Sequence, residues 1–246
     1  MRQIDKDSKE KRDKKYNKWA RTRPAYIFLA ILIALGLTMG INDYMATKLW
    51  GKAIIYLMSI SAIATALFFL LKFTLRDISK LYPGKILFCD RLKPTTKLLY
   101  NNDSTYTEEH KTEIRKKIKS KKNIELQKYK PKTFRNKKYV KRVDEAVVWL
   151  LDVTRFDNIL FEFNCIYGFW RNLTGALLVD AVIVWGLTAV NKWLYTLPFG
   201  NTLVWIGGVL ILLIIFTTLI AYNNGRIFAK KVYDVFMNLD EDINNY

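Results

Sequence analysis

One acidic residue inside a long apolar stretch is the residue best placed to do chemistry. Asp180 is the eighth residue of 173–190, and Leu, Val, Ala, Ile and Trp surround it. An aspartate at the centre of a membrane span costs about 2.5–3.5 kcal/mol, so such residues usually face a bundle interior or water. Asp180 therefore indicates either an interhelical hydrogen bond that fixes packing or, if chains assemble in a ring, an acidic lining suited to cations. The candidate hydrogen-bond partners are Thr217, Thr218, Ser59, Ser61 and Thr65.

A second feature is a run of positive charge. Residues 111–142 contain fifteen Lys and Arg against Glu113 and Glu125, and Pro131 divides the run. Clustered cations bind phosphates by releasing counterions, and each gains roughly 1 kcal/mol beside anionic lipid. Three interpretations stay open: a lipid-facing or solvated surface, a nucleic-acid or nucleotide site, and a dock for an acidic protein. The candidate contacts are Arg115, Lys116, Lys117, Lys121, Lys122, Arg135, Lys137 and Lys138.

A third group of polar residues precedes the stretch that contains Asp180. These five residues, called here the membrane-entrance residues, are Arg155, Asn164, Tyr167, Arg171 and Asn172. They stand among aromatic residues, and polar groups buried in such surroundings need hydrogen-bonding partners. Arg171 beside Trp170 also suits an anchor at the membrane surface. We expect mainly structural roles here.

Signatures of soluble enzymes are absent from the sequence. It contains no glycine-rich phosphate loop, no G-x-S-x-G and no H-E-x-x-H. The single histidine, His110, lies in a hydrophilic stretch, and with Cys89 and Cys165 it cannot complete a four-ligand zinc site. We expect no enzyme activity, no cofactor and no metal.

Four apolar stretches predict the helices that position these residues. They cover residues 25–45, 53–73, 173–190 and 202–222. A helix rises about 1.5 Å per residue, so each stretch reaches roughly 27–32 Å and matches the hydrocarbon core of a bilayer. The prediction is an all-α membrane protein with four transmembrane helices in two hairpins. Gly36 and Gly40 share one face of the first span, a spacing that favours close helix packing.

The distribution of charge predicts the orientation. Ten Lys and Arg fall in residues 1–24 and twenty-four in 72–172, whereas the loops at 46–52 and 191–201 contain only three. Basic segments remain on the cytoplasmic side, so both termini and the middle segment should be cytoplasmic in a multi-pass inner-membrane protein. The expected parts are a basic N-terminal segment (1–24), a first hairpin (25–73), a basic helical domain (74–172), a second hairpin (173–222) and an amphipathic C-terminal helix (223–246).

Two local patterns predict helices in the cytoplasmic parts. Thr105 and Glu108 have the spacing of a capping box ahead of a helix over 109–122. In the C-terminal tail, apolar residues recur at helical spacing, which predicts a helix that folds against the cytoplasmic domain. These residues are Phe228, Val232, Val235, Phe236 and Leu239.

Residues 94–172 carry a resemblance. The segments Pro94-Thr95-Thr96-x-Leu98-Leu99 and Asn164-x-x-Tyr167-Gly168-Phe169-x-Arg171-Asn172 resemble a family of bacterial four-span membrane proteins with one cytoplasmic domain between two hairpins. That layout is similar to membrane accessories and effectors of antiphage systems, including CRISPR-associated ones. The family pattern has a second arginine where this chain has Trp170, and no catalytic residues carry over.

The resemblance implies a membrane effector or accessory in antiviral defence. Its basic domain would dock an anionic partner, either anionic lipid or a nucleic acid or nucleic-acid-bound protein complex, and its spans would form a homo-oligomer that alters membrane permeability. The alternatives are an ion channel or transporter unrelated to defence, and a membrane scaffold.

Overall fold

The computed structural model describes residues 2–44, 78–79, 94–99, 104–126, 137–194 and 200–239. Helices and the turns between them make up this part of the chain, and no strand occurs in it. The all-α prediction is therefore confirmed. Of the four predicted spans, 53–73 lies outside the described residues.

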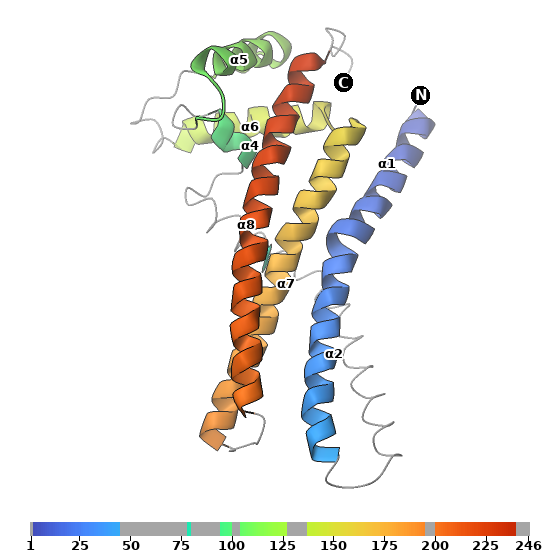
Figure 1. Ribbon diagram of the computed structural model, residues 1–246. Coiled ribbons are helices and arrows are strands. Elements are labelled where there is room, and N and C mark those ends of the chain that lie inside the picture. The colour runs from blue at the N-terminus through green and yellow to red at the C-terminus, as the bar shows by residue number, and fades with distance from the viewer. Residues whose placement is uncertain are drawn as a thin grey trace. The chain divides into compact units, whose positions relative to one another are not determined.

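The helices are shown in Figure 1. They are α1 (Arg2–Tyr16), the π-helix η1 (Asn17–Thr22), α2 (Arg23–Tyr44), α4 (Pro94–Leu98), α5 (Glu108–Lys122), α6 (Lys137–Val153), α7 (Asn158–Leu194) and α8 (Gly200–Asn238). The chain divides into two compact units. The first unit comprises residues 1–83 and 168–221, and the second unit comprises 84–167 and 222–246. Both α7 and α8 contribute to each unit without a break.

The first unit is built around the part of α7 that follows Gly168. One side of this helix packs against α8 and α2 in a shared apolar cluster that includes Leu177, Leu210 and Leu35. A neighbouring side of α7 places Ala176 against Ala25 and Phe28 of α2. In the first unit α7 is therefore a central helix with partners on two sides.

Among the described residues, two helices are long and apolar enough to cross a membrane: α7 and α8. In their most apolar stretches only 44% of α7 and 28% of α8 is buried. A core helix of a soluble protein would be mostly covered, whereas these helices expose large apolar side chains. Those side chains are Val182, Trp185, Val190 and Trp193 on α7, and Val204, Trp205, Val209, Ile211, Leu212, Leu213, Ile215, Phe216 and Leu219 on α8. Their exposure weakly supports a lipid-facing surface.

The second unit has its own hydrophobic core. It is formed by α4, α5, α6, the start of α7 and the end of α8, and Figure 1 shows α5 in green and the end of α8 in red. Val232 and Phe236 of α8 are fully buried in it, and Phe228 and Leu239 pack against it, whereas Val235 of the same predicted face is half-buried. The tail is not a separate helix, however, because α8 continues unbroken from the fourth apolar stretch to Asn238.

The start of α5 differs from the predicted capping box. Thr107, not Thr105, is the N-cap, and its hydroxyl accepts a hydrogen bond from the His110 amide at 3.3 Å. The Thr105 hydroxyl instead accepts one from Arg226 Nη2 on α8 at 3.0 Å. Both threonines precede the acidic first turn of α5. Sequence spacing alone therefore could not show that Thr107 is the N-cap and that Thr105 contacts α8.

Candidate functional site

The Pro94-Thr95-Thr96 segment of the resemblance is a packing element of the second unit. Thr95 and Thr96 are buried at the start of α4. The Thr95 carbonyl accepts a 2.6 Å hydrogen bond from the hydroxyl of Tyr233, and the Thr96 hydroxyl donates a 2.9 Å bond to Asp144 Oδ1 on α6. These bonds tie the short α4 helix to both α8 and α6.

Tyr233 lies at the centre of this arrangement. It is fully buried, and its ring meets Tyr106 edge-on with 6.2 Å between centroids. Burial, and secondarily the nearby Tyr106, raises the pKa of the Tyr233 phenol well above its ordinary value. The Tyr106 hydroxyl in turn donates to the Lys230 carbonyl at 3.0 Å. The Tyr233 phenol therefore stays neutral and donates its hydrogen bond from within the core.

Tyr233 should make the second unit sensitive to alkali. Its folded-state pKa is raised, so the folded unit binds more protons than the unfolded one, and stability falls as pH rises above the ordinary tyrosine value of about 10. Tyr233→Phe removes the hydrogen bond to Thr95, so its free energy of unfolding at neutral pH should be lower than that of the native chain by about 0.5–1.5 kcal/mol. When the pH is raised, the stability of Tyr233→Phe should fall less than that of the native chain. Limited proteolysis of the full chain on either side of pH ~10 measures both effects. Tyr26→Phe, at an exposed tyrosine, is the matched control. An equal alkaline loss in Tyr233→Phe and the native chain would contradict the prediction.

Three cations of α5 serve the core instead of an external partner. Lys111 is 1% exposed, and its ammonium lies 3.4 Å from Glu108 Oε1. Arg115 is buried and donates a 2.9 Å bond to the Leu99 carbonyl. Lys117 Nζ donates to the carbonyls of Met237 and Leu239 at 2.9 and 2.8 Å and so caps the end of α8. Arg115 and Lys117, two of the predicted partner contacts, therefore make hydrogen bonds within the second unit.

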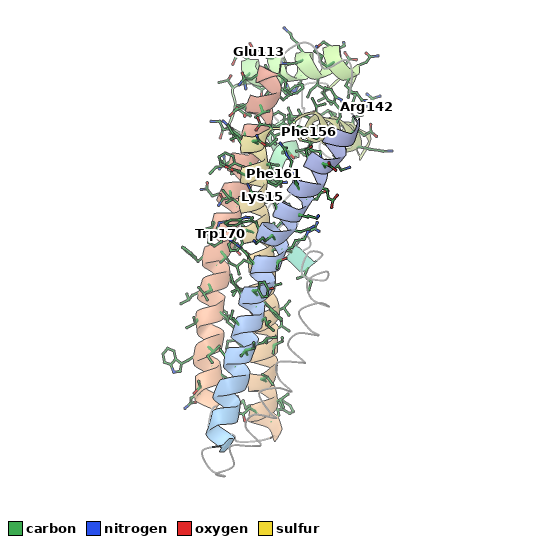
Figure 2. The ribbon with its side chains drawn as sticks, turned by 90° about the vertical axis from the view of Figure 1, so that its right-hand side faces the viewer. Lys15, Glu113, Arg142, Phe156, Phe161 and Trp170 are labelled. Carbon is green, nitrogen blue, oxygen red and sulfur yellow. The ribbon has the colours of Figure 1, made fainter. Side chains whose placement is uncertain are left out.

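Several other described cations of α5 and α6 are exposed, and they are called here the exposed basic face. Lys116 and Lys122 of α5 are exposed, and Lys121 is half-buried. Lys119 is exposed too, but it forms a 2.8 Å ion pair with Glu125. On α6, Arg142 is exposed; Figure 2 labels it together with Glu113 of α5. Arg135 lies outside the described residues, as do the side chains of Lys137 and Lys138 in the first turn of α6.

The membrane-entrance residues do not form a single site. Arg155, Asn164 and Tyr167 belong to the second unit, whereas Arg171 and Asn172 belong to the first. The Tyr167 ring stacks on Phe228 with 6.1 Å between centroids. Arg155 is exposed, and Asn164 and Arg171 are half-buried. Four of them lie on α7, which contributes to both units, and Arg155 lies in the turn that precedes α7.

Asn172 forms a buried polar junction in the first unit. Its Nδ2 donates to the Ala20 carbonyl of η1, and its Oδ1 accepts a 2.6 Å bond from the Ser79 hydroxyl. In an α-helix the Ala20 carbonyl would accept from the amide of residue 24, but that residue is Pro24, which has no N–H. The chain adopts a π-helix over Asn17–Thr22 at this point, and Asn172 supplies a donor. Asn172 therefore links three segments that are distant in sequence.

Two glycines let those segments approach α7. A Cβ at position 168 would lie 2.7 Å from the Tyr16 hydroxyl oxygen and 2.9 Å from Ala20 Cβ, and one at position 175 would lie 2.9 Å from Ser79 Cβ. Gly168, Asn172 and Gly175 follow one another at helical spacing, so they lie on the same side of α7. The role of Gly168 in the structure is this close contact with η1.

Asp180 is fully buried in the first unit. Within the described part of the chain, neither carboxylate oxygen has a hydrogen-bond partner. The predicted bonds to Thr217 and Thr218 are not formed: the Thr217 hydroxyl donates within its own helix to Leu213 and Ile214, and the Thr218 hydroxyl is buried without a partner among the described residues. The other predicted partners, Ser59, Ser61 and Thr65, lie outside those residues.

Comparison of the chain with protein-family models, curated proteins and solved structures found no match. The resemblance over residues 94–172 therefore stays a prediction. The features of the chain that bear on function are the exposed basic face, the apolar helices α7 and α8, and Asp180. Gly36 and Gly40 lie in α2, and their surroundings are outside the described side chains.

Proposed function

We propose that this chain is a multi-pass protein of the bacterial inner membrane with four spans in two hairpins and both termini in the cytoplasm. The length of α7 and α8 and their exposed apolar side chains support this proposal. Trp193 and Trp205, near the connection between these helices, are 87% and 78% exposed, as expected for tryptophans at a membrane surface. At the start of α2, the Arg23 guanidinium carbon lies 3.3 Å from the centroid of the Trp19 ring, a pairing suited to the opposite surface.

In this proposal the second unit is a cytoplasmic dock. Its exposed basic face offers Lys116, Lys122 and Arg142 to an anionic partner, while its buried cations hold the unit together. We favour a role as a membrane effector or accessory in antiviral defence without enzyme activity, in line with the resemblance over residues 94–172. Binding at the dock would recruit a nucleic-acid-bound complex to the membrane or change the permeability of an oligomer.

The observation that carries this proposal is the continuity of α7 and α8. Each helix contributes both to the basic second unit and to the apolar first unit, and neither is interrupted in the described residues. Binding at the second unit would therefore act on two helices that also belong to the first unit. An ion channel or transporter unrelated to defence and a passive scaffold are the alternatives; a transporter should contain broken spans, and no proline lies inside 25–45, 53–73, 173–190 or 202–222.

The effector proposal is tested by expressing the full chain in a bacterial host with and without phage challenge. Phage yield, cell growth and a dye for membrane potential are followed together. Reduced phage yield with a fall in potential supports a permeability effector, and reduced yield with an intact potential supports a recruiter. Unchanged phage yield in cells that contain the protein in the membrane would reject the defence role.

The exposed basic face should carry the affinity for anionic partners. Replacing both Lys116 and Lys122 with Gln removes two charges, and at about 1 kcal/mol each the affinity should fall about 30-fold. Binding of the full chain in zwitterionic nanodiscs to single-stranded RNA is measured at two salt concentrations, because fewer phosphate contacts also flatten the salt dependence. Retention of anionic lipid after extraction is measured in parallel.

The matched control replaces Lys9 and Lys11, two exposed lysines of α1, with Gln. It makes the same change in net charge away from the second unit. A loss in RNA binding confined to the α5 variant supports the nucleic-acid dock, and a loss in lipid retention alone supports a lipid face. Equal effects of both pairs would show that net charge, not this face, governs binding.

A further inference from the structure

Among the described residues, Asp180 has neither a hydrogen-bond partner nor an ion-pair partner to compensate a buried charge. The three described stretches at its level are 24–42 of α2, 172–191 of α7 and 201–221 of α8, and apart from Asp180 they contain no Asp, Glu, Lys, Arg or His. Their titratable tyrosine, Tyr26, is 57% exposed. No oppositely charged group on these elements can therefore neutralise the carboxylate.

A bound metal ion does not fit the surroundings either. Among the described residues, no group of three or more His, Cys, Asp or Glu could hold a metal. The side chains packed one turn on either side of Asp180 are apolar, with Ala176 on one side and Val184 on the other, and both are fully buried. Hard cations need several oxygen ligands, which these side chains cannot supply.

The acidic ring is also disfavoured. A pore lined by one Asp180 from each chain requires this side chain on an outer face of the hairpin, where copies could meet. Asp180 is instead 0% exposed within a single chain. An ionised carboxylate so placed would cost several kcal/mol, and a buried group under this penalty neutralises itself by taking up a proton.

We propose that Asp180 is a proton-binding site inside the second hairpin, occupied by a proton while α7 is packed against α2 and α8. The carboxyl is then a neutral acid, and it releases its proton when the helices separate far enough to admit water. This inference rests on the proposed membrane location of α7 and goes beyond it, since it names a ligand and a residue that binds it.

Carbodiimide labelling of the full chain in lipid vesicles near neutral pH tests the site. The acid O–H adds across a carbodiimide C=N bond to give an O-acylisourea, which rearranges to a stable N-acylurea that keeps all atoms of both reactants. Because the first step needs a protonated carboxyl, an apolar carbodiimide should modify Asp180, and a water-soluble cationic one should not. Mass spectrometry of the peptide that contains residue 180 locates the adduct.

Asp180→Asn should abolish the adduct, and it should also remove a protonated-carboxyl C=O band from infrared difference spectra. Asp152→Asn, at an exposed aspartate of α6, should leave both signals unchanged. Labelling of Asp180 by both reagents would overturn the membrane location, because water then reaches the site. No label from either reagent together with no protonated-carboxyl band from Asp180 would overturn the proton-binding site and leave the membrane location standing. These readouts use the native chain, so they hold even if a variant fails to fold.

Discussion

Replacing Phe236 with alanine is expected to destabilise the second unit by about 3–5 kcal/mol. Phe236 is fully buried in the core of that unit. Its ring meets Trp149 of α6 edge-on with 5.7 Å between centroids, and the Lys117 ammonium lies 5.4 Å from the centroid of the same ring. The change would leave a cavity at the point where α8, α6 and α5 meet, so the loss includes both the transfer term and the cavity term.

Hydrogen exchange of the full chain in nanodiscs measures this loss. Amides of α5 and α6 should exchange faster in Phe236→Ala, whereas those of α2 should not change. Phe216→Ala is the matched control, since Phe216 lies on the same helix but is 58% exposed. If Phe216→Ala loosened α5 and α6 as much as Phe236→Ala, the second unit would not have the core described above.

Helical periodicity was enough to predict which face of the tail is buried. Val232 and Phe236 follow a 3.6-residue repeat, and that repeat is a local property of the sequence. The continuity of α8 was harder to predict, because the polar residues that follow 202–222 suggested an end to the helix. Asn223 and Asn224 have weak helix propensity, yet packing in the second unit carries the helix through them.

Local patterns could not separate structural from exposed cations in the lysine run. Arg115 and Lys117 look like their neighbours in sequence, but their acceptors lie 16 and at least 120 residues away. Burial of Lys111 likewise depends on which face of α5 meets the core, and the many lysines hid that face. The tertiary structure shows that, among the described residues of the predicted set, Lys116 and Lys122 are exposed and Lys121 is half-buried.

The polar junction at Asn172 had a signal in the sequence that could have been used. Pro24 follows a helical stretch and removes the amide that would bind the Ala20 carbonyl in an α-helix, so this buried acceptor has to find another donor. Which donor fills that need could not be predicted, because Asn172 is 152 residues away from Ala20. The glycine at position 168 was visible, but its contact with η1 was not.

Asn172→Leu should therefore destabilise the first unit by about 2–4 kcal/mol, although leucine is close to asparagine in size. The substitution leaves two buried polar groups without this partner: the Ala20 carbonyl, whose usual donor Pro24 cannot provide, and the hydroxyl of Ser79, which is 0% exposed. Thermal unfolding of the full chain in detergent measures the loss.

Two further variants decide whether that loss comes from the junction. Asn223→Leu makes the same chemical change at an exposed position of α8 and should shift stability by no more than about 0.5 kcal/mol. Asn172→Asp keeps an acceptor for Ser79 but removes the donor to Ala20, so its loss should come from the η1 carbonyl and from the new charge. Asn172→Leu could instead unfold at the same temperature as the native chain. The Ala20 carbonyl would then have to accept a hydrogen bond within the π-helix itself, and η1 would depend on Pro24 and not on its contact with α7.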